Sequence, residues 1–294
     1  MSLSDAVREH CAHVVANARH VTIDLDRTSD VAPGPEPELD PVRHFVEGTR
    51  EEVAAYLFAL TAINFGSGWF PTLRKRVVDG KPVSGYFTVA MGLTDRFRAA
   101  GPWSNEELRA MRAEEIAEVT GQHPGHELMD LFAQALRQLG RFLGDRTALA
   151  AIEAADGSAQ RLAQTVASGM SMWHDVGFYK RAQILANDLT LGGVARFTDV
   201  DTLTIFADNL VPHVLRTDGV LVYDDALAAT IDAERLLLDA RMEREIRAAA
   251  VHACAHIAKR LDVPERILDM WLWNRGQDAR YKARPRHRAR TVFY

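Results

Sequence analysis

The stretch A-E-R-L-L-L-D-A-R-M-E-R-E-I-R-A-A-A-V-H-A-C-A-H-I-A-K-R-L at residues 233–261 is the longest helical pattern in the chain. Its apolar positions recur at intervals of three and four residues, which places them on one face of a helix. The side chains that share this face are Met242, Ile246, Ala250, Cys254, Ile257 and Leu261. We therefore expect a long amphipathic helix that packs against a core.

Helix-start signals recur along the chain and extend this interpretation. A capping box pairs Ser or Thr with an acidic residue three positions later, and it stabilises the first turn of a helix. Such boxes are predicted at Thr49–Glu52, at Ser104–Glu107 and, in a weaker form, at Thr198–Asp201. The expected helices are 49–62, 125–142, an amphipathic segment opening at M-S-L-S-D-A-V-R-E-H, and one that Pro264 opens and W-L-W-N-R-G ends.

Strand signals are few. V-T-I-D at 21–24 and V-L-V-Y at 220–223 have the composition of short strands. The Pro-rich stretch 26–40 is expected to be a surface loop, and no later Pro/Gly-rich linker divides the chain. We predict a single, mainly α-helical domain over residues 1–294, with two helical lobes around a cleft.

Composition limits the classes of function. The net charge is -5, which speaks against a broad nucleic-acid-binding face. One local exception is the basic stretch Y-K-A-R-P-R-H-R-A-R at 281–290, for which a solvated tail is the alternative interpretation. No apolar run is long enough to span a membrane, and the start lacks a signal-peptide core. Cys11 and Cys254 have no partner motif, so a cytoplasmic, reducing location is expected.

Several common catalytic patterns are missing. The chain has no phosphate-binding P-loop, no dinucleotide fingerprint and no G-x-S-x-G elbow. L-G-G-V at 191–194 and G-S-G-W at 66–69 are typical of turns. His252 and His256 have zinc-site spacing, but Ala253 stands where a zincin needs its glutamate base. Neither a metal nor a cofactor is therefore expected.

The stretch L-T-I-F-A-D-N at 203–209 carries an apolar run directly into Asp208, and Lys180 lies in the similar setting F-Y-K-R-A-Q-I-L. A partly desolvated carboxylate exerts a strong local field, which suits a reaction with a cationic transition state. Cleavage of a sugar–base bond has such a transition state, because an oxocarbenium ion develops at the sugar. The alternative is a helix cap or a buried ion pair, with Lys180 as its partner.

Four strings of the sequence carry a family resemblance. They are I-N-F-G-S-G-W, F-Y-K-R-A-Q-I-L-A-N-D-L, F-T-D-V-D-T-L-T-I-F-A-D-N-L-V-P-H-V-L and the terminal R-A-R-T-V-F-Y. In this order they resemble the queuosine salvage protein family, the queuosine 5′-phosphate N-glycosylase/hydrolases. The resemblance extends from V-T-I-D at 21–24 to Tyr294, and residues 101–160 add little to it.

The resemblance implies a fold similar to helix-hairpin-helix DNA glycosylases. Those enzymes place an aspartate soon after a hairpin with a Gly-rich turn, and L-G-G-V followed by Asp208 has the same order. The tighter L-P-G-V-G turn of such hairpins is absent. This departure and the acidic composition speak against DNA binding.

The activity implied by the resemblance is hydrolysis of queuosine 5′-monophosphate to queuine and ribose 5-phosphate. Queuine is a 7-deazaguanine base with a cyclopentenediol, and it is recycled into tRNA. Asp208 of F-A-D is then the catalytic carboxylate, and Lys180 of F-Y-K-R lies in the same pocket, near the ribose or the phosphate. The expected partners are this small nucleotide and its product, with no stable nucleic acid and no membrane.

The other site residues are assigned by chemistry within that interpretation. Asp278 suits the N–H donors of a guanine-like edge, since a carboxylate accepts them well. The residues expected to hold the base are Trp273, Asp278 and Tyr281, with His44, Asn64, Phe65 and Phe206 as further stacking or hydrogen-bonding groups. A folded-back tail would offer Arg286, His287 and Arg288 to the phosphate.

Two alternatives stay open at this point. A glycosylase that acts on a modified base in tRNA or DNA keeps the chemistry, and it requires strong, salt-sensitive nucleic acid binding. A non-catalytic carrier of queuine or a nucleotide binds its ligand without turnover and has no need of a desolvated carboxylate.

Overall fold

The computed structural model describes residues 1–294, and the long predicted helix is present in it as α12 (Ala240–Leu261). It is shorter than the predicted stretch 233–261, so the prediction was wrong for its first turns. The Asp239 side chain accepts a hydrogen bond from the Arg241 N–H and starts the helix there. Before it, Leu237 N–H donates to Arg288 O, so this segment pairs with the C-terminal chain instead of continuing the helix.

The other helices and strands alternate with short connections. The α-helices are α1 (Leu3–Ala16), α2 (Arg50–Ala62), α3 (Gly85–Ala100), α4 (Asn105–Ala110), α5 (Ala113–Thr120), α6 (Glu127–Leu143), α7 (Ala148–Glu153), α8 (Ala159–Gly169), α9 (Lys180–Leu191), α10 (Leu210–Thr217), α11 (Asp225–Asp232), α13 (Glu265–Arg275) and α14 (Ala279–Lys282). Short 3-10 turns are η1 (Asp26–Asp30), η2 (Phe70–Thr72), η3 (Ser171–Trp173) and η4 (Val200–Thr202). The prediction of a mainly helical domain with a few short strands is confirmed.

The two predicted strands are β1 (Val21–Ile23) and β4 (Leu221–Tyr223), and they pair with each other antiparallel. A second pair, β2 (Val77–Val78) and β3 (Lys81–Pro82), was not predicted. Each strand of this hairpin has only two residues, which is too short to show an alternating pattern.

The predicted capping boxes at Thr49–Glu52 and Ser104–Glu107 are present at the starts of α2 and α4. The third box, Thr198–Asp201, was wrong. Its segment forms only the 3-10 turn η4, because Thr198 Oγ1 donates to Gly157 O and Asp201 pairs with Arg266 of α13 instead. Polar side chains near a helix start can bond to distant parts of the chain instead of capping that helix, and sequence spacing does not distinguish the two.

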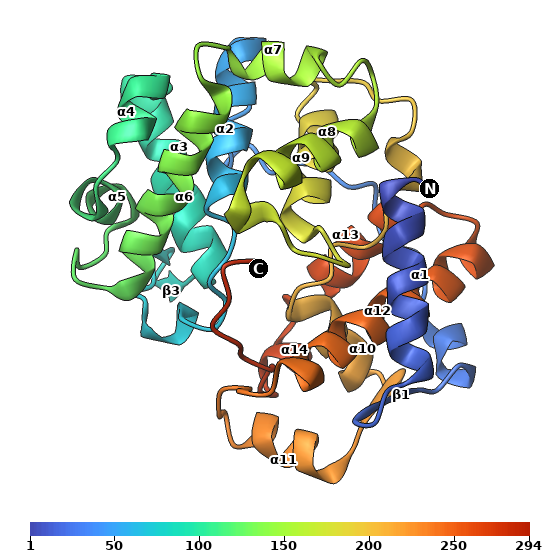
Figure 1. Ribbon diagram of the computed structural model, residues 1–294. Helices are drawn as coiled ribbons and strands as arrows, with labels where there is room; N and C mark the ends of the chain where they lie inside the picture. Colours follow the sequence, from blue (N-terminus) through green and yellow to red (C-terminus); the bar gives the residue numbers. More distant parts are fainter.

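The helices form two groups, which Figure 1 shows with α2 to α7 on one side and α1 with α10 to α14 on the other. Helices α8 and α9 pack on each other, α9 contacts α2, and α1 packs along α12 and also contacts α8. Buried apolar side chains form one continuous cluster through both groups. None of the helices is both long and apolar enough to cross a lipid bilayer.

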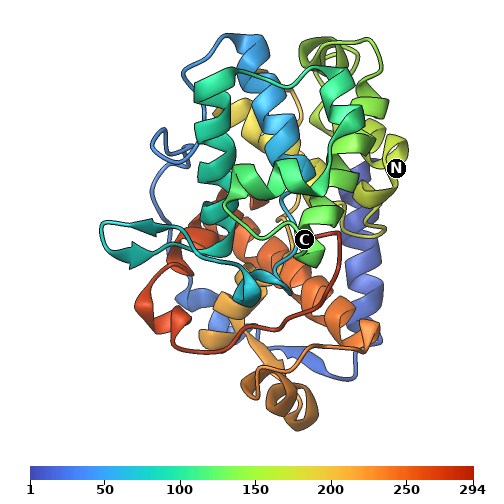
Figure 2. The same ribbon diagram turned by 90° about the vertical axis from the view of Figure 1, so that its left-hand side faces the viewer.

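The C-terminal segment 283–294 runs between the two groups, as Figures 1 and 2 show. Tyr294 O accepts from Gly66 N–H at 2.9 Å, and Arg181 Nη2 donates to Val292 O at 2.9 Å. The turn at 66–69 admits this approach because a Cβ on Gly68 would lie 2.3 Å from Ala289 O. The basic stretch therefore folds back into the protein, and the solvated-tail alternative is wrong for residues 285–289, which are buried or half-buried.

Candidate active site

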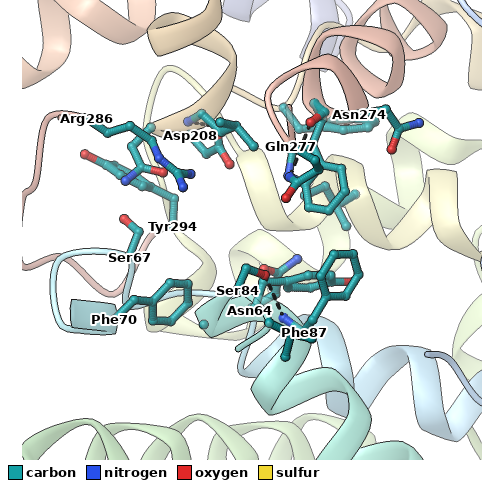
Figure 3. Close-up of a pocket in the computed structure, with 18 of the residues that line it drawn as sticks. Asn64, Ser67, Phe70, Ser84, Phe87, Asp208, Asn274, Gln277, Arg286 and Tyr294 are labelled. Atoms are coloured by element: carbon teal, nitrogen blue, oxygen red, sulfur yellow. Dashed lines mark hydrogen bonds between the residues drawn. The ribbon is translucent and has the colours of Figure 1, made fainter. Parts of the chain in front are cut away.

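A cavity of about 760 Å³ lies between the two helical groups. Its walls come from the loop before α2, the turn 64–71, the start of α3, helices α9 and α13, the start of α10 and the C-terminal segment. Figure 3 shows Asp208 between Arg286 on one side and Gln277 on the other, with Asn64 and Phe87 across the cavity. A volume of this size fits one small-molecule ligand.

Asp208 stands in the cavity wall immediately before α10. Its Oδ1 accepts hydrogen bonds from Leu210 N–H at 2.7 Å and from Val211 N–H at 3.2 Å. These two bonds fix the carboxylate through Oδ1, and no hydrogen bond within the protein engages Oδ2. The helix-cap alternative is thus true of this residue, but a cap made through Oδ1 leaves Oδ2 available to a ligand.

The apolar run before Asp208 is a buried, extended segment without a strand partner. Buried backbone groups need hydrogen-bond partners, and here polar side chains supply them. Thr204 N–H donates to the Gln183 side chain at 2.9 Å, and Phe206 N–H donates to Asp269 Oδ1 at 2.8 Å. Arg247 Nε donates to Ala207 O at 2.9 Å. Three helices, α9, α12 and α13, therefore hold the backbone of the segment that leads into Asp208.

Arg247 is itself anchored in the core. It pairs with Asp175 at 2.6 Å and with Glu243 at 3.3 Å, and it packs over the rings of Phe178 and Tyr294. The neighbouring carboxylates raise its pKa above the usual range. A permanently charged guanidinium thus supports the segment that carries Asp208.

Lys180, the first residue of α9, is buried and lines the same cavity. Its Nζ donates to Asn64 O at 3.2 Å. Burial lowers its pKa to about 8, and the charge of Asp208 opposes that shift. The ammonium and the carboxylate are close enough to interact, although no direct ion pair joins them.

Two further buried carboxyl groups, Asp269 and Asp188, line the cavity and were not predicted. Burial raises the pKa of Asp269 to about 8, and the charge of Asp208 adds to the shift. Burial also raises the pKa of Asp188 to about 7, while its hydrogen bond with Asn187 opposes the shift. Asp269 therefore carries its proton at neutral pH.

One end of the cavity is aromatic. The Trp273 ring stands edge-on to Tyr86 at 5.8 Å and to Phe87 at 5.5 Å between centroids. His44 Nε2 bonds the Tyr86 hydroxyl at 3.0 Å, and burial lowers the pKa of His44. Asn274 of α13 and Gln277, just after that helix, lie beside this end in Figure 3. Aromatic faces with a few polar groups suit a planar heterocycle.

The other end is basic. Arg286 and Lys75 both line the cavity, and neither makes an ion pair with a carboxylate. Burial lowers the pKa of both side chains. The pKa of Lys75 falls to about 8, and the positive charge of the nearby Arg286 contributes to that shift. Ser67 and Tyr294 lie near Arg286 in Figure 3. Burying two neighbouring cations without counter-ions costs free energy, and a bound anion would offset that cost.

The structure brings most of the predicted site residues together. The cavity is lined by Lys180, Asp208, His44, Asn64, Phe65, Phe206, Trp273, Arg286 and Arg288. Phe65 contributes little surface, because its ring packs edge-on against Phe132 in the core.

Asp278, Tyr281 and His287 do not line the cavity, and this placement corrects their predicted roles. Asp278 is exposed at the start of α14. The Tyr281 hydroxyl donates to Asp218, away from the cavity. His287 is buried, and burial lowers its pKa to about 3, so it has no charge to offer a phosphate. A basic run in a sequence does not reveal which of its members point inward.

Among the residues that were missed, Asp269 follows an apolar helix face and could have been suspected from its place one turn before Trp273. Lys75 and Tyr86 carry no local signal, since only the folded chain brings them to the cavity. The arrangement combines a basic end, the Asp208 carboxyl group and an aromatic end in that order, which suits cleavage of a nucleotide between its sugar and its base.

Comparison with known proteins supports the same conclusion. The family model described as "Queuosine salvage protein" matches residues 44–294. The queuosine 5′-phosphate N-glycosylase/hydrolase of Sphaerobacter thermophilus is 31% identical over 96% of this chain and 95% of its own length. The proteins of the same name from Bos taurus and Mus musculus are 26% and 25% identical, over 98% and 87% of this chain and 98% and 85% of their own lengths.

Proposed function

Because the chain belongs to the queuosine salvage protein family, we propose that it hydrolyses the N-glycosidic bond of queuosine 5′-monophosphate. The products are queuine, for salvage into tRNA, and ribose 5-phosphate. The enzyme is an N-glycosyl hydrolase, and its substrate is a small nucleotide. The observation that carries the assignment of the site is Asp208, an anchored carboxylate between a basic and an aromatic end of one cavity.

The order of groups along the cavity supports one orientation of the substrate. The 5′-phosphate meets Arg286 and Lys75 at the basic end, and the base enters the aromatic end beside Trp273. The ribose then lies opposite Asp208. A guanidinium and an ammonium bind phosphate strongly when they are partly desolvated.

Asp208 acts on C1′ of the ribose in this arrangement. As the bond to the base breaks, positive charge develops on the ring oxygen and C1′, and Asp208 Oδ2 faces that charge. The carboxylate needs no reorganisation, because the α10 N–H groups hold Oδ1 before the substrate arrives. Lys180 holds the carbonyl of Asn64 and balances the negative charge of the site.

The substrate is a free nucleotide and not a polynucleotide. The cavity, at about 760 Å³, has room for one nucleotide, and a chain of net charge -5 has little attraction for a phosphate backbone. A cytoplasmic location suits the two free, buried cysteines, since reducing compartments preserve thiols.

The test is product analysis with purified protein and queuosine 5′-monophosphate, separated by liquid chromatography. Wild type releases queuine, with or without a chelator, and Asp208→Asn does not. The matched control is Asp224→Asn, which alters a carboxylate at the start of α11 that lies outside the cavity. Intact substrate with wild type would overturn the proposal, and equal loss in both variants would overturn the role of Asp208.

A further inference from the structure

Asp269 is a buried acid in the cavity wall, and the proposed function gives it no role. It lies on α13 one turn before Trp273, so the two side chains share one face of the helix. Trp273 belongs to the aromatic end, and Phe206 N–H, two residues before Asp208, donates to Asp269 Oδ1 at 2.8 Å. Asp269 is therefore positioned between the base site and the carboxylate that faces C1′.

The surroundings of Asp269 keep its proton on. No Lys, Arg or His lies within ion-pair distance, and the residue is only 4% exposed. The charged or titratable groups that face it are Asp208 before α10, Asp188 and Lys180 on α9, and the Cys254 thiol on α12. Burial and the Asp208 charge together outweigh the attraction of Lys180, so the group is a neutral carboxylic acid with an O–H to donate.

The leaving group needs such a donor. A 7-deazaguanine base has carbon where guanine has N7, so the ring nitrogen often protonated in purine cleavage is missing. The remaining basic nitrogen of the bicyclic ring near the sugar is N3, which is conjugated to N9. A base that leaves without a proton departs as an anion, and that is costly in a cavity which already holds the charge of Asp208.

We propose that Asp269 is the acid that protonates the departing base, an inference that rests on the proposed function. The C1′–N9 bond breaks, its electron pair moves onto the base, and the Asp269 O–H proton goes to N3. The base leaves neutral and reaches its usual tautomer in water. Water then adds at C1′, and its released proton restores Asp269, so the reaction returns the enzyme to its starting state.

The experiment compares two leaving groups. One substrate is queuosine 5′-monophosphate, and the other is 4-nitrophenyl riboside 5-phosphate, whose nitrophenolate departs without protonation. Asp269→Asn keeps an acceptor for Phe206 N–H but has no acidic proton. General acid catalysis contributes about 100-fold to 10,000-fold, so we expect a kcat loss of that size on the nucleotide and a loss under about 5-fold on the nitrophenyl compound.

A matched control is Glu265→Gln, which alters another buried carboxyl of α13. Glu265 pairs with Arg8 at 2.8 Å, outside the cavity, and its substitution tests the cost of disturbing the helix. It should change both substrates alike and by a small factor. Asp208→Asn should lose activity on both, because both pass through a cationic sugar.

The outcomes separate this inference from the proposed function. Equal losses on the two substrates in Asp269→Asn would overturn the acid role and leave the hydrolase intact, since the residue would then act only through structure. A wild-type enzyme that leaves queuosine 5′-monophosphate intact would overturn both.

Discussion

Replacing Gly68 by Ala should displace the C-terminal segment that carries Arg286. The ideal Cβ at this position lies 2.3 Å from Ala289 O, 2.7 Å from Ala289 C and 3.0 Å from Arg290 N. All three atoms belong to backbone, so no side chain can rotate away. Ordinary contact begins at 3.4 Å, so the segment must move by about 1 Å.

That movement reaches the cavity. Tyr294 O and Val292 O each hold one hydrogen bond from the neighbouring elements, and Arg286 and Arg288 stand in the cavity wall on the same segment. A displacement of about 1 Å at a binding group costs up to about 100-fold in rate. We expect kcat/KM for queuosine 5′-monophosphate to fall by about 30-fold to 100-fold, with a loss of about 1–3 kcal/mol in stability from overpacking.

The assay is the rate of queuine release, measured beside thermal unfolding. Gly125→Ala is the control, because its added Cβ meets only the flexible His123 side chain at 3.2 Å. It should keep activity within about 2-fold of wild type. Wild-type kcat/KM in Gly68→Ala would refute the claim that the folded-back segment forms the phosphate end of the site.

Three further predictions concern ionisable residues. Arg286→Ala should lower kcat/KM on queuosine 5′-monophosphate by about 10-fold to 100-fold, since a hydrogen bond to a charged group contributes about 1.5–3 kcal/mol, while the rate on the nucleoside without phosphate stays unchanged. Arg247→Met leaves Asp175 buried without its partner, and urea unfolding should show a loss of about 3–5 kcal/mol. The raised pKa of Asp269 means that its stabilising contribution is complete below its unfolded pKa and is lost as pH rises through about 8. Asp269→Asn should therefore raise the melting temperature at pH 9 relative to wild type and reduce the loss of stability between pH 5 and pH 9. An equal pH dependence in the two proteins would contradict the buried, protonated state.

The parts of the fold that depend on nearby residues were predictable from the sequence. The capping boxes of α2 and α4, the apolar face of α12 and the two strands near residues 22 and 222 follow from side-chain spacing, and they appear in the structure. The antiparallel pairing of those strands joins segments 200 residues apart, which a periodicity does not encode.

The site was predictable where chemistry and order in the chain coincide. Asp208 and Lys180 stand out because a charge interrupts an apolar run, and both line the cavity. Asp278 was predicted to accept the N–H donors of the base, yet it is exposed, while Asp269, nine residues earlier, is buried and lines the cavity. Helix phase decides between them, and the end of α13 before Asp278 resets that phase.

The most direct test of the central claim separates binding from chemistry at Asp208. Calorimetry would measure the affinity of Asp208→Asn for intact queuosine 5′-monophosphate, and single-turnover kinetics would measure cleavage by the same sample. If the carboxylate acts on the cationic transition state, affinity stays within about 5-fold of the wild-type KM and cleavage falls by at least about 1,000-fold. Cleavage at the wild-type rate, or a loss that is explained fully by weaker binding, would contradict the account.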